Sequence, residues 1–175
     1  QYFTMYDYNQ KTQQTGLYVQ DQMAVDNWRL TIGGREDWVH TGTTFHNLND
    51  ATNTQRDKHF SGNAALSYVF DNGITPYLSY AESFQAGSGT QVASTGAFKP
   101  TEGKQYEVGV KYQPPGTKAL FTAAVFDLTQ QNTSVTEGSI TRQVGEVRVR
   151  GLELEASADV TESLKLVGSY TYNDS

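Results

Sequence analysis

The sequence lacks cysteine, a surplus of basic residues and any long apolar run. Without cysteine it can form neither a disulfide framework nor a cysteine-ligated zinc site. Its 13 lysines and arginines against 19 acidic residues give a formal net charge of -6, which argues against binding to nucleic acid. No stretch approaches the ~20 apolar residues of a transmembrane helix, and residues 1–20 do not have the pattern of a signal peptide. With a mean hydropathy of -0.57, the 175 residues look at first like a soluble domain.

The composition also permits a membrane protein of another kind. Aromatic residues make up 12% of the chain, eleven of them tyrosine, and glycine occurs 16 times. Charged residues make up 18%, compared with roughly 25% in ordinary soluble domains. A membrane β-barrel needs apolar residues only at alternate positions of each strand, so its mean hydropathy stays low. The composition is therefore compatible with a barrel.

Apolar and polar residues alternate with a period of two along most of the chain. In residues 105–112, for example, Tyr106, Val108 and Val110 alternate with polar residues or glycine. This is the period of a strand with one apolar face, and we find no convincing segment with the period of a helix. We expect strands at residues 16–25, 28–38, 60–70, 74–84, 105–112, 120–128, 143–158 and 164–172.

The connections between these predicted strands alternate between short and long. The short ones are Asp26-Asn27, 71–73, 114–117 and 159–163, and the long ones are the polar segments 40–57, 85–102 and 129–142. Short turns at one end and long loops at the other are typical of outer-membrane barrels. A soluble sandwich with Greek-key connections has no reason to alternate in this way. The alternation therefore favours a barrel.

The spacing of aromatic residues supports a membrane-spanning wall. Trp28 and Trp38 are ten residues apart on one face of a predicted strand, and so are Phe60 and Phe70. Ten residues at ~3.3 Å each cover about 33 Å along a strand. A tilt of ~45° reduces this to roughly 23 Å, close to the ~25 Å apolar band between the aromatic girdles of a membrane barrel.

The predicted strand 143–158 contains a break in the alternation. The apolar parity changes at Gly151, between Val149 and Leu152. A β-bulge at Gly151 would restore one continuous apolar face and turn Arg148 and Arg150 inward. Without a bulge both arginines face outward, which costs ~2–4 kcal/mol each at the middle of a bilayer and little near the anionic headgroups. We therefore expect a bulge at Gly151.

Four segments of the sequence resemble the TonB-dependent outer-membrane receptors. The first, Arg150-Gly151-Leu152-Glu153 within residues 145–156, is similar to the Arg-Gly-x-Glu segment of that family. The others are residues 15–22, 71–84 and 99–111, and together the four span most of the chain. Within the family, the sequence resembles in particular the receptors for ferric hydroxamate siderophores of the ferrichrome and ferrioxamine type.

This resemblance implies a receptor of the bacterial outer membrane with a 22-stranded barrel and an N-terminal plug. Such a receptor binds and imports a ferric siderophore with TonB-coupled energy, and no further cofactor is expected. The implied partners are the ferric siderophore, the TonB-type inner-membrane complex acting through the plug, and outer-membrane lipid and lipopolysaccharide. The chain departs from the pattern because it has no plug, no energy-coupling box, and no terminal aromatic residue after Asp174-Ser175. We therefore expect residues 1–175 to be one partial domain: all-β, antiparallel, with about eight transmembrane strands of the barrel.

The candidate ligand contacts lie at the ends of predicted strands that face the extracellular rim. A ferric hydroxamate is compact and nearly neutral, which suits aromatic walls with a few hydrogen-bonding groups. The candidates are Trp38, His40, Phe45, His46, Phe84 and Gln85. Among them, Trp38 has the parity of a lipid-facing residue. We expect the charged residues with lumen-facing parity to contact a plug or water: Arg29, Arg35, Glu107 and Lys111.

Neither a catalytic nor a metal site is predicted. His40, His46 and His59 lie near acidic residues in or beside one predicted loop, but their spacing matches no ligand motif. The sequence also contains no Gly-x-Ser-x-Gly elbow and no zinc-protease helix. Three alternatives stay open: a passive outer-membrane porin or other channel, a barrel enzyme with perturbed carboxylates and histidines at the lumen rim, and a soluble β-sandwich. The sandwich predicts an apolar core between two sheets, whereas the barrel predicts an outward apolar face.

Overall fold

The computed structural model describes residues 8–46, 51–87, 98–137, 140–143, 145–161 and 163–175. These residues form ten strands. They are β1 (Tyr8–Val25), β2 (Trp28–Phe45), β3 (Ala51–Tyr68), β4 (Ile74–Gln85), β5 (Thr101–Tyr112), β6 (Ala119–Gln131), β7 (Ser134–Glu137), β8 (Ile140–Gln143), β9 (Glu146–Thr161) and β10 (Leu164–Asp174). No helix within the described ranges is long and apolar enough to cross a membrane.

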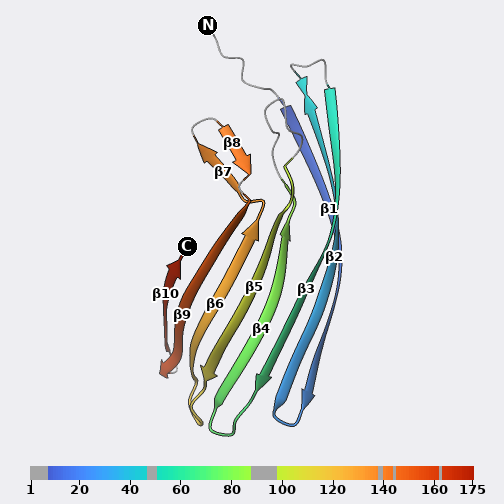
Figure 1. The fold of residues 1–175 in the computed structure, drawn as a ribbon. Coiled ribbons are helices and arrows are strands. Elements are labelled where there is room, and N and C mark those ends of the chain that lie inside the picture. Colours follow the sequence, from blue (N-terminus) through green and yellow to red (C-terminus); the bar gives the residue numbers. More distant parts are fainter. Residues whose placement is uncertain (1–7, 47–50, 88–97, 138–139, 144, 162) are drawn as a thin grey trace.

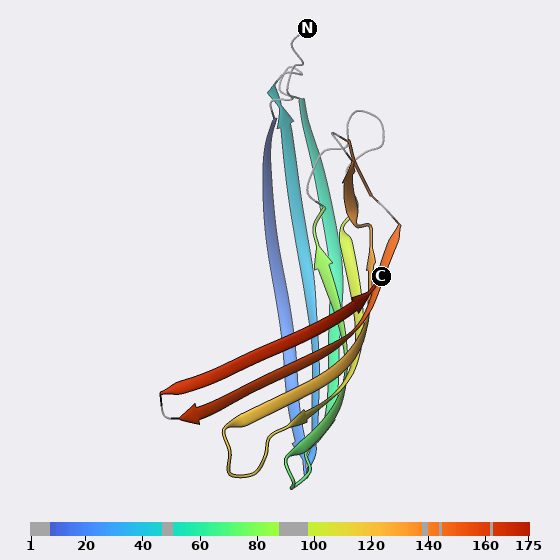
Figure 2. The ribbon, with the colours of Figure 1, turned by 90° about the vertical axis from the view of Figure 1, so that its left-hand side faces the viewer.

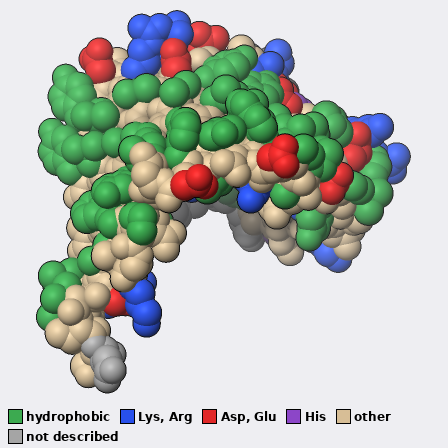
Figure 3. Space-filling view, turned by 90° about the horizontal axis from the view of Figure 1, so that it is seen from below, with side chains coloured by type: hydrophobic (Ala, Val, Ile, Leu, Met, Phe, Trp, Pro, Cys, Tyr) green, Lys and Arg blue, Asp and Glu red, His purple; other side chains and the backbone are tan. Residues whose placement is uncertain are grey.

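Eight strands form one antiparallel sheet in the order β1-β2-β3-β4-β5-β6-β9-β10, and β7 pairs with β8 as a separate hairpin (Figure 1). The connections 26–27, 69–73, 113–118 and 162–163 lie at one end of the sheet, which we call the turn end. The connections 46–50, 86–100 and 132–145 lie at the other end, which we call the rim. The sheet is curved, so that β9 and β10 cross in front of the first strands when it is viewed from the side (Figure 2). Seen from the turn end the wall is an arch (Figure 3). The predicted antiparallel strands are confirmed, and their connections alternate between the two ends of the sheet.

The two faces of this wall differ in polarity because the register aligns the alternating residues of all eight strands. One row across the sheet is wholly apolar except for a tyrosine hydroxyl: Met23, Leu30, Leu66, Leu78, Val108, Val125, Leu152 and Tyr172. The next row, on the opposite face, is mostly polar or small: Gln22, Thr31, Ala65, Ser79, Glu107, Phe126, Gly151 and Asn173. A slip of one residue would exchange the faces, so the apolar pattern specifies the register. We call these the outer and the inner face.

The apolar residues of the outer face do not form a core. Leu78, Val108 and Val125 are each more than half exposed, and the buried apolar residues in the described part of the chain are Val39, Phe98 and Ala124. A sandwich would bury its apolar residues between two packed sheets. The sandwich alternative is therefore wrong, and the outward apolar face is that of a membrane wall.

The strands nearest the amino terminus are longer than predicted. β1 begins at Tyr8 instead of residue 16, and β2 and β3 stay paired up to Phe45 opposite Ala51. The predicted loop 40–57 is therefore wrong, since only 46–50 connects the two strands. Likewise the segment 129–142 contains the rest of β6 and most of the β7–β8 hairpin. In these regions both faces are polar, so no apolar alternation marks the strands.

The predicted β-bulge at Gly151 is wrong. Pairing runs without interruption from Arg150 to Leu152 on both sides of β9, and the only register shift described between β9 and β10 lies at Leu164 and Lys165. Arg150 therefore shares the outer face with Leu152, as does Arg148. A close contact explains the glycine instead, because a Cβ at Gly151 would lie 2.5 Å from the carbonyl oxygen of Tyr172.

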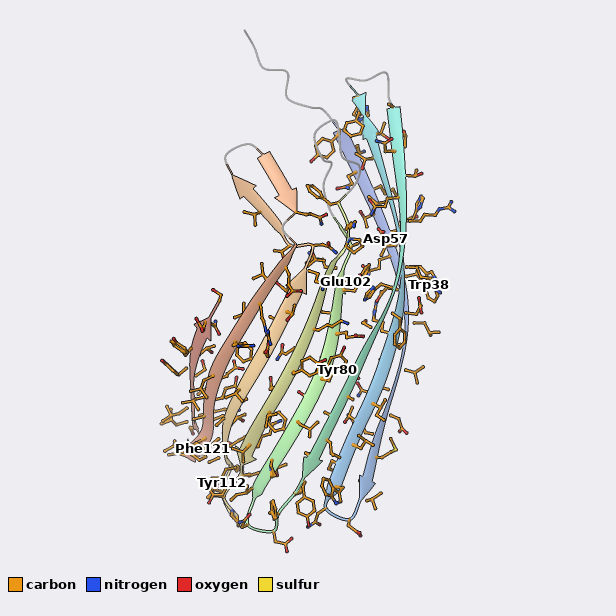
Figure 4. The ribbon with its side chains drawn as sticks, in the orientation of Figure 1. Trp38, Asp57, Tyr80, Glu102, Tyr112 and Phe121 are labelled. Carbon is orange, nitrogen blue, oxygen red and sulfur yellow. The ribbon has the colours of Figure 1, made fainter. Side chains whose placement is uncertain are left out.

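The aromatic residues used to estimate the height of the wall lie on its outer side. Trp28 and Trp38 are 49% and 43% exposed, and Phe60 and Phe70 are 59% and 47% exposed. Trp28 packs edge-on against Tyr68, with ring centroids 4.9 Å apart, at the turn end. Figure 4 shows Trp38 on the side of β2 that faces away from the other strands, with Tyr112 and Phe121 near the turn end. The outward orientation predicted for these residues is confirmed.

Candidate functional site

The inner face of β2 near the rim is covered by other parts of the chain. Four alternate residues of β2, Asp37, Val39, Thr41 and Thr43, keep only 3–5% of their surface exposed. Phe98, in the connection between β4 and β5, is also buried, and its carbonyl oxygen accepts a hydrogen bond of 3.2 Å from Gln55 Nε2 of β3. Phe98 therefore lies against the inner side of β3.

Gln55 and Asp57 form the first polar group of this surface. They alternate on the inner face of β3, and Gln55 Nε2 donates to the Asp57 carboxylate at 2.9 Å as well as to Phe98. Figure 4 labels Asp57 and shows it toward the rim, above Tyr80. The two side chains place an amide and a carboxylate next to the buried threonines of β2.

A second polar group is centred on Asp37. Arg35 Nε and Nη2 donate to the two oxygens of this carboxylate at 2.6 and 2.8 Å, and Gln14 Nε2 of β1 donates to it at 2.8 Å. Gly16 of β1 leaves room for the guanidinium group, since a side chain there would collide with it. Because its two oxygens already accept three hydrogen bonds, the Asp37 carboxylate is held in place by its neighbours.

Trp38 and His40 lie on the outer face. They alternate with the buried inner residues of β2, and Lys58 Nζ of β3 lies 6.0 Å from the ring centroid of Trp38. The structure therefore does not bring Trp38 or His40 to the inner surface. Their contact with a ligand stays a prediction, and their position on the outer face does not favour it.

Phe45 and His46 lie at the rim, where β2 ends. Phe45 packs against Tyr8 of β1 with ring centroids 6.2 Å apart, and it has the parity of the inner face. His46 follows the strand and is exposed. Both lie at the rim, and their contact with a ligand stays a prediction.

Phe84 and Gln85 end β4, beside a split in the sheet. The pairing of β3 with β4 stops at Asn63 opposite Ala81, and Phe84 stacks on His59 across the split with ring centroids 4.6 Å apart. In the same region His59 Nδ1 lies 3.4 Å from Glu102 of β5. Phe84 thus fills a gap in the wall, and its ligand contact is untested.

The Glu82 carboxylate takes the place of a missing strand partner in this split. It accepts hydrogen bonds from the Gly62 N–H at 3.0 Å and from the Tyr80 hydroxyl at 2.6 Å, and it lies 3.8 Å from Lys104 Nζ. Within the described residues no three histidine or acidic side chains converge as a metal site would require.

Sequence reasoning did not propose Gln55, Asp57 or Phe98 as ligand contacts. The first two lie in the segment that was predicted to be a loop, and Phe98 lies in a long connection without periodicity. No apolar alternation marks residues 51–59 as a strand, because polar residues occupy both of its faces.

The outer face carries a cluster of charges near the rim. The Asp127 carboxylate of β6 accepts hydrogen bonds from Arg148 at 2.8 and 2.5 Å and from Arg150 at 3.0 Å. Arg150 precedes the end of β9 at Thr161 by eleven residues. At ~3.3 Å per residue and a tilt of ~45°, that is about 26 Å above the turn end, at the upper edge of a ~25 Å apolar band.

The two-faced wall, the alternating connections and the outward aromatic residues define an outer-membrane barrel. In agreement, residues 1–175 match the family described as TonB dependent receptor-like, beta-barrel, and the chain belongs to that family. Among curated proteins it is 45% identical over 168 residues to the ferrichrome outer membrane transporter/phage receptor of Escherichia coli K12, which covers 94% of this chain and 22% of the relative. It is 41% identical over 176 residues to the ferrioxamine B receptor of Salmonella typhimurium LT2, covering 99% of this chain and 25% of the relative.

Solved structures share the same fold. The siderophore receptor PiuA from Acinetobacter baumannii superposes with a TM-score of 0.79 at 26% identity, over 96% of this chain and 26% of that one. The chain therefore spans about a quarter of the length of the relatives that it matches. Receptors of this family are proteins of the bacterial outer membrane, and the described strands are part of such a barrel.

Proposed function

We propose that the protein containing this chain binds a ferric siderophore of the hydroxamate type and imports it across the outer membrane with TonB-coupled energy. The observation that carries the proposal is the 45% and 41% identity, over nearly the whole chain, to relatives named for ferrichrome and ferrioxamine B. The proposed activity is transport without a catalytic step.

The inner surface near the rim has suitable chemistry for such a ligand. The Gln55 amide and the Asp57 carboxylate, which are only half-buried, offer hydrogen bonds, and Val39 and Phe98 lie beside them as buried apolar residues. Binding sites for small molecules combine an apolar lining with a few placed polar groups in this way. We propose that the ligand passes or binds along this part of β2 and β3.

Binding of ferric siderophores to the full-length parent protein tests this function. Both tryptophans of this chain lie on the outer face, so binding of iron-55-labelled ferrichrome and ferrioxamine is a better readout than tryptophan quenching. Saturable binding of a hydroxamate, with a ferric catecholate as the control ligand, supports the proposal. If no ferric chelate binds, the receptor function is wrong and a passive porin becomes the better explanation.

Two neighbouring residues of β3 supply a matched pair of variants. Asp57 faces inward and holds Gln55, whereas Lys58 faces outward beside Trp38. We expect Asp57→Ala to weaken hydroxamate binding about five- to tenfold, which corresponds to about 1–1.4 kcal/mol, the net contribution of about one hydrogen bond. Lys58→Ala should leave the dissociation constant within about twofold. Equal effects of the two variants would contradict a ligand on the inner face.

The middle of the inner face carries a polar cluster suited to the plug. The Tyr77 hydroxyl donates to Glu107 at 2.7 Å, Gln105 donates to the same carboxylate at 3.0 Å, and Lys111 Nζ lies 5.2 Å from the Tyr77 ring centroid. In a closed barrel these groups line the lumen at the depth where a plug would sit. We propose that they contact the plug through which the TonB-type complex acts.

The outer charge cluster of Asp127, Arg148 and Arg150 is suited to anionic lipid. The guanidinium groups are 53% and 60% exposed at the side chain, and they lie at the level where phosphate groups border the apolar band. Asp127 accepts hydrogen bonds from Nε and Nη2 of Arg148 and from Nε of Arg150, so each guanidinium group keeps further N–H donors that can bind phosphate. We propose that this cluster contacts the anionic headgroups of outer-membrane lipid, including lipopolysaccharide.

A further inference from the structure

Two of the connections at the rim are joined by the side chain of Gln143, the last residue of β8. Gln143 Oε1 accepts a hydrogen bond of 2.9 Å from the Lys99 N–H, and its Nε2 donates to the Lys99 carbonyl at 2.7 Å. The amide group therefore pairs with Lys99 as the backbone of a neighbouring strand would. Nε2 also lies 2.9 Å from the carbonyl oxygen of Asn132, so the same side chain reaches the end of β6.

Asn132, which follows β6, binds the residues next to Lys99. It has a φ of 58°, a left-handed conformation that asparagine tolerates better than most residues. Its Nδ2 donates to the Pro100 carbonyl at 3.0 Å, and its own carbonyl accepts a hydrogen bond of 3.2 Å from the Thr101 hydroxyl. We call Gln143 and Asn132 the clamp, and residues 99–101 the arm that it holds.

The arm leads directly to Phe98. Phe98 is 4% exposed, and its carbonyl oxygen accepts the hydrogen bond from Gln55, which also holds Asp57. A continuous series of described contacts thus runs from the base of the β7–β8 hairpin, through the arm, to the inner face of β3. Neither residue of the clamp contacts Gln55 or Asp57 in this series.

We propose that Gln143 is a positioning residue of the ligand-binding surface: by pairing with Lys99 it holds Phe98 against the inner face of β3 and so orders Gln55 and Asp57. The inference rests on the proposed binding function, because it assigns a role within that surface. Loss of the pairing frees the arm while the strands of the wall keep their own ladders, so ligand affinity falls without loss of the barrel.

Hydrogen exchange at the Lys99 amide tests the clamp directly in the full-length protein, whether or not a ligand is known. We expect exchange at Lys99 to become at least about tenfold faster in Gln143→Ala, because its acceptor is removed. Gln131→Ala is the matched control, since Gln131 lies at the base of the same hairpin but makes one long hydrogen bond of 3.4 Å to Glu146. Unchanged exchange at Lys99 in Gln143→Ala overturns the proposal.

A double-mutant cycle with Phe98→Ala then tests the positioning role. If Gln143 acts through Phe98, each single variant weakens hydroxamate binding about five- to tenfold and the double variant is little worse than either. Additive losses show that Gln143 does not act through Phe98 and overturn the role, even where exchange at Lys99 has changed. Absence of hydroxamate binding by the unaltered protein contradicts the proposed function, while the exchange measurement still decides whether the clamp exists.

Discussion

The depth assigned to Arg150 leads to a quantitative prediction for the outer face of β9. Leu154 shares this face with Arg150 but lies seven residues from the end of the strand instead of eleven. Seven residues at ~3.3 Å and a tilt of ~45° place it about 16 Å above the turn end, close to the middle of a ~25 Å band. An arginine should therefore cost much more at Leu154 than at position 150.

The expected magnitudes follow from the known depth dependence of arginine on barrel surfaces. Leu154→Arg should lower the free energy of unfolding by about 2–4 kcal/mol, whereas Arg150→Leu should change it by no more than about 1 kcal/mol. Leu154→Gln is the matched control, because it introduces a polar side chain without the charge. The readout is the urea-dependent folding of the full-length parent protein and its variants into lipid vesicles. Unfolding free energies are compared between proteins for which the slope of free energy against urea concentration is the same.

The refuting result is equally specific. If Leu154→Arg costs less than about 1 kcal/mol, Leu154 does not lie near the middle of the bilayer, and the height scale that places Arg148 and Arg150 at the headgroups is wrong. If Arg150→Leu raises the free energy of unfolding by 2 kcal/mol or more, Arg150 lies deeper than proposed.

Two further predictions concern β9 and its neighbours. Gly151→Ala should lower the free energy of unfolding in the same vesicle assay by about 1–3 kcal/mol, because its Cβ would lie 2.5 Å from the Tyr172 carbonyl oxygen and 2.6 Å from the Phe126 ring. Gly168→Ala on β10, where nothing lies within 4 Å of the added Cβ, should stay within about 0.5 kcal/mol, and equal effects would contradict the described packing. For the lipid proposal, we expect the double variant Arg148→Ala/Arg150→Ala to lose most of the lipopolysaccharide retained by the purified parent, measured by phosphate content. Lys58→Ala, which removes an outer charge on β3, should retain most of it, and full retention by the double variant would contradict the proposal.

The Gly151 region illustrates where reasoning from the sequence went wrong. The change of parity between Val149 and Leu152 is real, but the pairing of β9 with β6 and β10 is unbroken. The bulge was preferred to outward arginines near the headgroups, whereas the unbroken strand puts Arg148 and Arg150 on the outer face, and the length of β9 gives Arg150 a depth at the upper edge of the apolar band. Parity alone carries no information on depth, because depth depends on strand length, tilt and the position of each turn.

The sequence by itself determined that this chain is a set of antiparallel strands with one apolar face, because period-two alternation and short turns are local properties. The alternation therefore predicts, without any tertiary contact, that Leu78, Val108 and Val125 lie on the apolar face. Only the tertiary structure decided the lengths of β2 and β3, whose rim segments are polar on both faces. It also decided the inner surface of Gln55, Asp57 and Phe98 and the clamp at Gln143, because these contacts join side-chain amides to backbone groups up to 44 residues away in the sequence.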